Sequence, residues 1–376
     1  MATSRKQQKR KDQRNRPLNI NEQAGVQMAV ADLRWCIESF QVMQLDAKNS
    51  SILALIVLPF YSQVLIESST LKKNLQMSRG LQQWQLSHSD EAAKYEYRMR
   101  HRLKFVDNTK IDIPTMETEL EHISVEFYSQ FRMHPIKCLR RFQTDLGMYY
   151  VADKPVGANF TATFHLGYDS PEQIEGEHLR ELSAEYGADL RFLFSWFSGE
   201  TELPLPPTDA DVNWSIRCKD CRSEEYFGSR YTTGISTQRK RILFLIESGI
   251  NDVLFILPRL ELGFRGTYFR KLVLIAYHSL NTIRKVIPED IEQPELRAFR
   301  KFAVNDSVAL LLESDQGRAL RNRCMHYLNT YNNIVFDSRD PESCIVKSLF
   351  PGMEITDFEK KLSEYLTSIS TAMTNL

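Results

Sequence analysis

The sequence predicts a mainly α-helical protein: a mostly helical N-terminal region, a small mixed α/β insert, and a C-terminal antiparallel helical bundle. Apolar residues recur every three or four positions along most of the chain, whereas alternation of apolar and polar residues is confined to short stretches of the insert. Hydrophobic residues make up 42% and charged residues 26% of the 376 residues, which is typical of a folded soluble protein. At ~150 residues per domain, the length predicts two or three domains.

The first 16 residues are basic and lack an apolar period, which predicts a disordered arm. They hold seven Arg and Lys and one Asp, so residues 17–376 carry a net charge of −6 although the whole chain is neutral. This balance excludes a body that binds polyanions through net charge alone. No apolar stretch suited to an export signal follows the arm, so export is not expected.

Residues 17–146 predict a helical N-terminal region, because apolar residues there fall on one stripe of a helix. The first stripe comprises Val26, Val30, Leu33, Ile37 and Phe40. The most apolar stretch, Ile52 to Ile66, is shorter than the ~20 residues that span a bilayer, and Pro59 and Gln63 interrupt it. It predicts a buried core helix and no membrane contact.

Residues 147–235 predict a mixed insert and linker. Apolar and polar residues alternate over Asn159–Leu166 and again over Val212–Cys218, which predicts two half-buried strands. Leu190–Phe197 fits either a strand or the buried end of a helix. Pro and Gly punctuate the last third of the insert, which places a domain boundary before residue 236.

Residues 236–376 predict the bundle. Ser236 or Thr237 can cap its first helix, which runs to Leu257, and Gly263 indicates a turn after it. The further predicted helices are Tyr268–Val286, Glu295–Glu313, Gln316–Tyr331 and Thr356–Met373. Helices of this length with short connections form antiparallel bundles.

Six scattered Cys do not form a disulfide framework, so we expect a reducing compartment, the cytoplasm. Cys218 and Cys221 form the only CxxC pair, which is half of a tetrahedral zinc site; ordinary thiols are the alternative. Phosphate loops, dinucleotide fingerprints, zinc-protease helices and nucleophile elbows do not occur in the sequence. We therefore expect no cofactor.

The run Arg321-Asn322-Arg323-Cys324-Met325-His326 lies on a predicted helix of the bundle. With 29 Arg and 8 His in the chain, an Arg-x4-His pair is expected by chance about 0.6 times, and the added Asn lowers that to about 0.03. This is also the only Arg that precedes a His by five to seven positions. The motif is therefore the main functional candidate.

The residue types of this motif suit phosphate chemistry. Asn322 and His326 are four positions apart and should project from one helix face. Arg321 is expected near the helix N-terminus, where free N–H groups and the dipole favour an anion. A planar guanidinium can bind two phosphate oxygens at once, and an imidazole, with an ordinary pKa of ~6.5, can transfer a proton near neutral pH.

The segment resembles the Arg-x4-His motif of the HEPN superfamily in its Arg-Asn-x3-His form, and the resemblance covers about 236–376. It implies a metal-independent endoribonuclease that acts as a homodimer, in which Arg321, Asn322 and His326 of both copies flank one RNA phosphate. It also implies that His326 assists attack of the ribose 2′-hydroxyl, which leaves a 2′,3′-cyclic phosphate. One toxin branch of the superfamily continues His-x-Tyr, whereas here Tyr327 follows directly, so we expect Tyr327 to be a packing residue.

The leading hypothesis is a cytoplasmic ribonuclease that acts as a toxin or anti-phage effector. Its N-terminal two-thirds would sense a signal or restrain the activity, and a regulatory protein is a candidate partner. Six residues are candidates for further RNA contacts, with a plain charged helix face as the alternative: Tyr95, Tyr97, Arg98, Arg100, Arg102 and Lys104. The alternative is a non-catalytic helical interaction or RNA-binding module. A third hypothesis is a zinc-stabilised nucleic-acid binder centred on Cys218 and Cys221.

Overall fold

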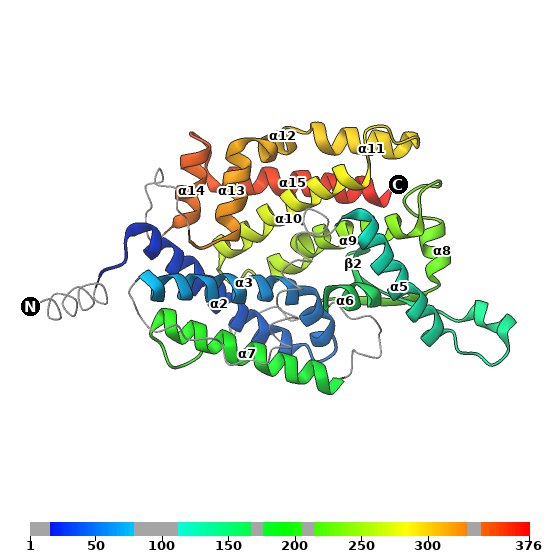
Figure 1. Cartoon of the computed structure of the whole chain (residues 1–376), viewed down its shortest axis with the longest axis horizontal. Coiled ribbons are helices and arrows are strands. Elements are labelled where there is room, and N and C mark those ends of the chain that lie inside the picture. Colours follow the sequence, from blue (N-terminus) through cyan, green and yellow to red (C-terminus); the bar gives the residue numbers. More distant parts are fainter. Residues whose placement is uncertain (1–15, 79–111, 167–175, 205–213, 329–339) are drawn as a thin grey trace, which may run out of the picture.

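Helices dominate the structure, and one small antiparallel sheet completes it (Figure 1). This computed structural model describes residues 16–78, 112–166, 176–204, 214–328 and 340–376. Nearly all of the basic arm, and the stretch from Tyr95 to Lys104 considered for RNA contact, lie outside the described residues. The prediction of a mainly helical chain is confirmed, and the strands form a small antiparallel sheet.

Among its described residues, the N-terminal region contains three long helices, as predicted: α2 (Ile20–Leu45), α3 (Ser50–Ser78) and α5 (Ile113–Phe131). Asn19 begins α2 by accepting a hydrogen bond from the Glu22 amide at 2.9 Å, and a short turn at residues 46–49 leads into α3. In the described part of the chain, only α3 is long and apolar enough to cross a membrane. However, 61% of its most apolar window is buried within the protein, as in the core helix of a soluble protein.

The insert contains strands β1 (Leu146–Val151), β2 (Lys154–Ala158) and β3 (Arg217–Cys221), which pair antiparallel in the order β2-β1-β3. Its helices are α6 (Asn159–Leu166), α7 (Gly176–Ser198) and α8 (Ser223–Gly228). The strand predicted over Asn159–Leu166 is wrong: the segment is α6. Six of its eight residues are buried, so the alternation of apolar and polar residues did not correspond to one buried face and one solvent face.

Two further predictions in the insert are settled by the structure. The second predicted strand begins only at Arg217, whereas Val212 lies outside the described residues. The ambiguous stretch Leu190–Phe197 is helical and belongs to α7. β1 and β2 were not predicted, because β1 alternates poorly between buried and half-buried residues and four of the five β2 residues are buried.

The C-terminal part is helical throughout its described length. Its elements are α9 (Thr237–Asn251), the π-helical turn η4 (Asp252–Ile256), η5 (Leu257–Leu260), α10 (Arg265–Val286), α11 (Pro294–Asn305), α12 (Ser307–Glu313), α13 (Asp315–Met325), α14 (Pro341–Leu349) and α15 (Ile355–Thr374). Ser236 caps α9 as predicted, accepting from the Arg239 amide at 3.1 Å. The helix predicted over Glu295–Glu313 is two helices, because Asp306 breaks it and caps α12 through the Val308 amide at 2.7 Å.

A single hydrophobic core runs through the N-terminal helices, the sheet and the C-terminal helices. In Figure 1, α10 to α15 lie above α2, α3 and α7. Helix α2 comes very close to the segment that follows α13: a Cβ added to Gly25 would lie 2.4 Å from the Tyr327 carbonyl oxygen. Only glycine permits this approach without a shift of the backbone. The N-terminal helices therefore help to place the end of α13.

Candidate functional site

The motif residues lie at the C-terminal end of α13, not near its N-terminus. The helix begins at Asp315, where the Ser314 hydroxyl accepts a hydrogen bond from the Gly317 amide at 3.0 Å. Arg321 is the seventh of eleven helical residues, and the helix ends at Met325 instead of the expected Tyr331. The expectation that backbone N–H groups assist Arg321 in binding an anion is therefore wrong. Any attraction for phosphate must come from side-chain charge.

His326 caps the helix with extended backbone, φ −119° and ψ 127°. Its amide donates to the Asn322 carbonyl at 3.0 Å, so the two residues are in contact through the backbone. Because His326 has left the helical conformation, its side chain does not follow the helix face that the four-residue spacing predicted. The motif residues share one end of α13, but they are not aligned along it.

The imidazole of His326 is paired with a glutamate from another helix. Its Nδ1 lies 2.8 Å from Oε2 of Glu67 in α3. The Glu67 side chain is only 4% exposed, whereas that of His326 is 43% exposed. A buried carboxylate that binds one ring nitrogen fixes the orientation of the ring. Nε2 is then the nitrogen that remains for proton exchange with a bound molecule.

Glu67 was not identified from the sequence. The available signal was its spacing of four from Gln63, which places both polar residues on one helix face at the end of the apolar stretch Ile52 to Ile66. Gln63 is also used in the structure: its amide nitrogen donates to the Met325 carbonyl at 3.3 Å, and its Oε1 accepts from Lys271 Nζ at 2.7 Å. One face of α3 therefore binds both the end of α13 and the His326 ring.

Arg321 and Asn322 are half-buried. The Arg321 guanidinium lies over the ring of Tyr277 in α10, 4.8 Å from its centroid. Its Nε is buried and has no hydrogen-bond partner among the described residues. Stacking on an aromatic ring holds the planar cation in place and leaves its terminal nitrogens able to bind an anion.

A balanced cluster of buried charges lies under this site. Asp32 in α2 contacts Arg270 and accepts a hydrogen bond from the Tyr327 hydroxyl at 2.5 Å, and Lys271 lies 4.0 Å away. Burial alone would raise the pKa of Asp32, but Arg270 and Lys271 outweigh it and hold the pKa below its usual range. Arg270 also contacts Glu342 in α14. Tyr327 is buried, as expected for a packing residue.

Cys218 and Cys221 both lie on β3, which is paired along its length with β1. Residues three apart on a strand point to opposite faces of the sheet, so these two thiols do not converge on one ion. Cys218 is exposed, and the half-buried Cys221 thiol contacts the Leu146 carbonyl at 3.6 Å. Within the described ranges, no three His, Cys, Asp or Glu side chains form a group that could hold a metal.

An apolar cavity of about 590 Å³ lies between α2, α3 and α7. Its lining includes Phe40, Leu58 and Leu190, with Arg180 and Arg191 among the polar residues. None of the motif residues lines it. The cavity is therefore separate from the His326 site.

Comparisons with known proteins assign no family to the chain: no family model, curated protein or solved structure matches it. Its function must therefore be inferred from its own residues and geometry. The strongest chemical arrangement among the described residues is the pair of His326 and Glu67, at the end of the helix that also carries Arg321.

Proposed function

We propose that this protein is a metal-independent endoribonuclease of the HEPN type. The observation that carries the proposal is the position of His326: the histidine of the Arg-Asn-x3-His motif is partly exposed and binds a buried carboxylate through Nδ1. A surface histidine without a chemical role does not need a buried carboxylate as its partner. Burying the charge of Glu67 costs free energy unless the carboxylate is paired. The pairing instead suits a group that takes up and releases a proton.

In the proposed reaction, Nε2 of His326 removes the proton from a ribose 2′-hydroxyl. The 2′-oxygen then forms a bond to the adjacent phosphorus, and the bond from phosphorus to the 5′-oxygen breaks. The 5′-oxygen takes up a proton, so the products are a 2′,3′-cyclic phosphate and a 5′-hydroxyl. Arg321 stabilises the charge that builds on the phosphoryl oxygens. Asn322 orients Arg321 and His326. DNA lacks the attacking hydroxyl and is not cleaved.

This chemistry needs one group that accepts a proton and one that donates a proton. The motif of one chain supplies a single imidazole, whereas two copies supply two. We therefore propose a homodimer in which the C-terminal bundles meet and both copies of His326 flank one phosphate. The roles as a cytoplasmic toxin or anti-phage effector, and control by a regulatory protein, are proposed from the family resemblance.

The alternative is a non-catalytic helical interaction or RNA-binding module. The position of Arg321 favours it, because a guanidinium stacked on Tyr277 with its Nε buried also contributes to packing between α10 and α13. In such a module, the paired His326 would stabilise the end of α13 and carry out no chemistry. The two functions differ in whether RNA is cut.

A cleavage assay on mixed RNA in EDTA tests the proposal. We expect the wild type to cut RNA, and His326→Gln and Arg321→Ala each to lose at least ~100-fold in rate. His122→Gln on the exposed side of α5 and Arg318→Ala one turn earlier on α13 are matched controls that should retain activity. Binding of RNA without cleavage, unchanged by His326→Gln, would instead support the non-catalytic module.

A further inference from the structure

Residues 131–142, between α5 and β1, form a projection from the body of the protein. In Figure 1 this segment extends beyond α5 at the right of the molecule. Its large apolar side chains are between 37% and 69% exposed: Phe131, Met133, Ile136, Leu139 and Phe142. Soluble proteins rarely gather such side chains on an exposed surface unless the surface binds something. We call residues 131–142 the apolar protrusion.

The local backbone arranges the protrusion into an apolar edge and a basic edge. It contains the 3₁₀ helix η2 (Lys137–Phe142), which Ile136 precedes as N-cap. A 3₁₀ helix has three residues per turn, so residues three apart lie in line. Ile136, Leu139 and Phe142 therefore form one edge, and Lys137 and Arg140 form the next.

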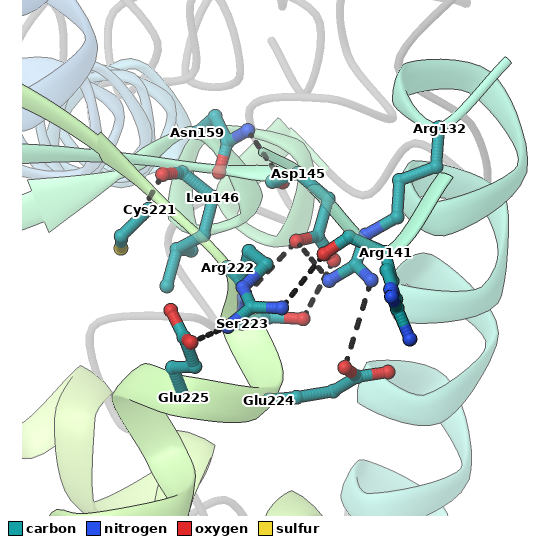
Figure 2. A network of polar contacts seen from close by, with 10 residues as sticks. All are labelled: Arg132, Arg141, Asp145, Leu146, Asn159, Cys221, Arg222, Ser223, Glu224 and Glu225. Carbon is teal, nitrogen blue, oxygen red and sulfur yellow. Dashed lines mark hydrogen bonds and ion pairs between the residues drawn. The ribbon is translucent and has the colours of Figure 1, made fainter. Parts of the chain in front are cut away.

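The base of the protrusion is held by polar contacts, of which the one between Arg132 and Asp145 is buried (Figure 2). Arg132 is 1% exposed and donates to the Asp145 carboxylate at 2.9 Å, which also accepts from the Ser223 hydroxyl at 2.6 Å. Arg222 Nη1 donates to the Arg141 carbonyl at 2.7 Å. These contacts tie the protrusion to α5, β1 and the start of α8. The apolar edge is thus ordered before any partner binds, which lowers the entropic cost of binding.

We propose that the apolar protrusion docks an acidic amphipathic helix of another protein. No Asp or Glu occurs in residues 131–142, whereas Lys137, Arg140 and Arg141 all carry positive charge. The complementary surface therefore has an apolar stripe bordered by carboxylates. Phe, Met and Arg are also the residue types enriched at the cores of protein interfaces. This inference does not depend on the ribonuclease proposal.

Other occupants fit the charges and residue types less well. The apolar cavity between α2, α3 and α7 has Arg180 and Arg191 in its lining, so docking there by a second copy would bring like charges together. Helices that lie on a membrane surface also combine Lys or Arg with Trp, Phe or Leu, but many of them are about 20–30 residues long. The helix η2 has only six residues.

Two synthetic helical peptides test the proposal on the full chain. Both carry the same face of Leu and Phe, and the opposite face carries Glu in one peptide and Lys in the other. By fluorescence anisotropy, we expect the Glu peptide to bind, more weakly as salt is raised, and the Lys peptide not to bind. The double substitution Leu139→Ser with Phe142→Ser should weaken binding at least ~10-fold. Leu310→Ser, at a leucine on α12 that is more exposed than Leu139, is the control and should bind normally.

Three outcomes would overturn the proposal. The first is equal binding of both peptides, or binding that survives the double serine substitution. The second is a concentration-dependent dimer of the wild type that this substitution abolishes, because the occupant would then be a second copy. The third is absence of peptide binding together with sedimentation on vesicles of phosphatidylserine and phosphatidylcholine. Because the substituted side chains are exposed, equal thermal unfolding midpoints will show that the variants remain folded.

Discussion

The ring of His326 depends on a glutamate that lies 259 positions earlier in the chain. Glu67→Gln keeps the size of that side chain and removes its charge. We expect RNA cleavage to slow by at least ~10-fold, because the imidazole loses the carboxylate that orients it. The rate of RNA cleavage by each variant is the measurement.

The matched control for Glu67→Gln is Glu38→Gln. Glu38 is also a buried glutamate, but it binds Arg34 within α2 and does not contact His326. An equal loss of cleavage rate in both variants would show that general stability, and not the His326 pair, is responsible.

Asp252 is buried in the π-helical turn η4, and its Oδ1 has no hydrogen-bond partner among the described residues. Burial raises the pKa of this carboxyl well above its usual range. In the unfolded chain the carboxyl ionises near pH ~3.9, so its favourable contribution is complete below that pH and is lost as pH rises toward the folded-state pKa.

Asp252→Asn should therefore have little effect near pH 4 and become stabilising relative to wild type as pH rises. The gain is up to ~1.4 kcal/mol per pH unit until the folded-state pKa is reached. Urea unfolding at pH 4.5, 6 and 7.5 measures it, with the exposed Asp290→Asn as control. A difference in stability that is constant with pH would refute the raised pKa.

At the scale of elements, α2 meets the segment after α13 at Gly25. An alanine methyl there would lie 2.4 Å from the Tyr327 carbonyl, so α2 or the segment that carries His326 must shift. We expect Gly25→Ala to lose about 1–3 kcal/mol in the free energy of unfolding and to slow cleavage. Gly187→Ala on α7, where nothing lies within 4 Å, should instead be neutral or stabilising by about 0.5–1 kcal/mol. Equal stability of the two variants would contradict the close approach.

Most helices could be predicted because their apolar residues recur every three or four positions. The break at Asp306 could not, since Val304 and Val308 continue the apolar period across it. The early end of α13 was hidden for a similar reason, because Tyr327 is buried even though it is no longer helical. The contact between His326 and Glu67 joins two distant helices, so no local pattern could reveal it. The motif itself was visible, and its partner was not.

At the scale of the whole molecule, the N-terminal helices complete the charge balance of the C-terminal part. Asp32 binds Arg270, and Gln63 binds Lys271, both of which are buried. Removing the partner of a buried charge costs about 3–5 kcal/mol. The C-terminal part, residues 236–376, is therefore not expected to be stable by itself.

A fragment of residues 236–376 tests this dependence. We expect it to be insoluble, or to unfold without a cooperative thermal transition and without the near-ultraviolet circular dichroism of packed aromatic rings. A fragment that unfolds cooperatively and cleaves RNA would show that the N-terminal helices do not support the site.

The central claim is that His326 transfers a proton in 2′-hydroxyl attack on RNA. The most direct measurement is the chemical identity of the RNA ends produced by the full chain in EDTA. We predict 2′,3′-cyclic phosphate and 5′-hydroxyl ends with the wild type, and neither with folded His326→Gln. Ends that carry a 3′-hydroxyl, or identical ends from wild type and His326→Gln, would contradict the claim.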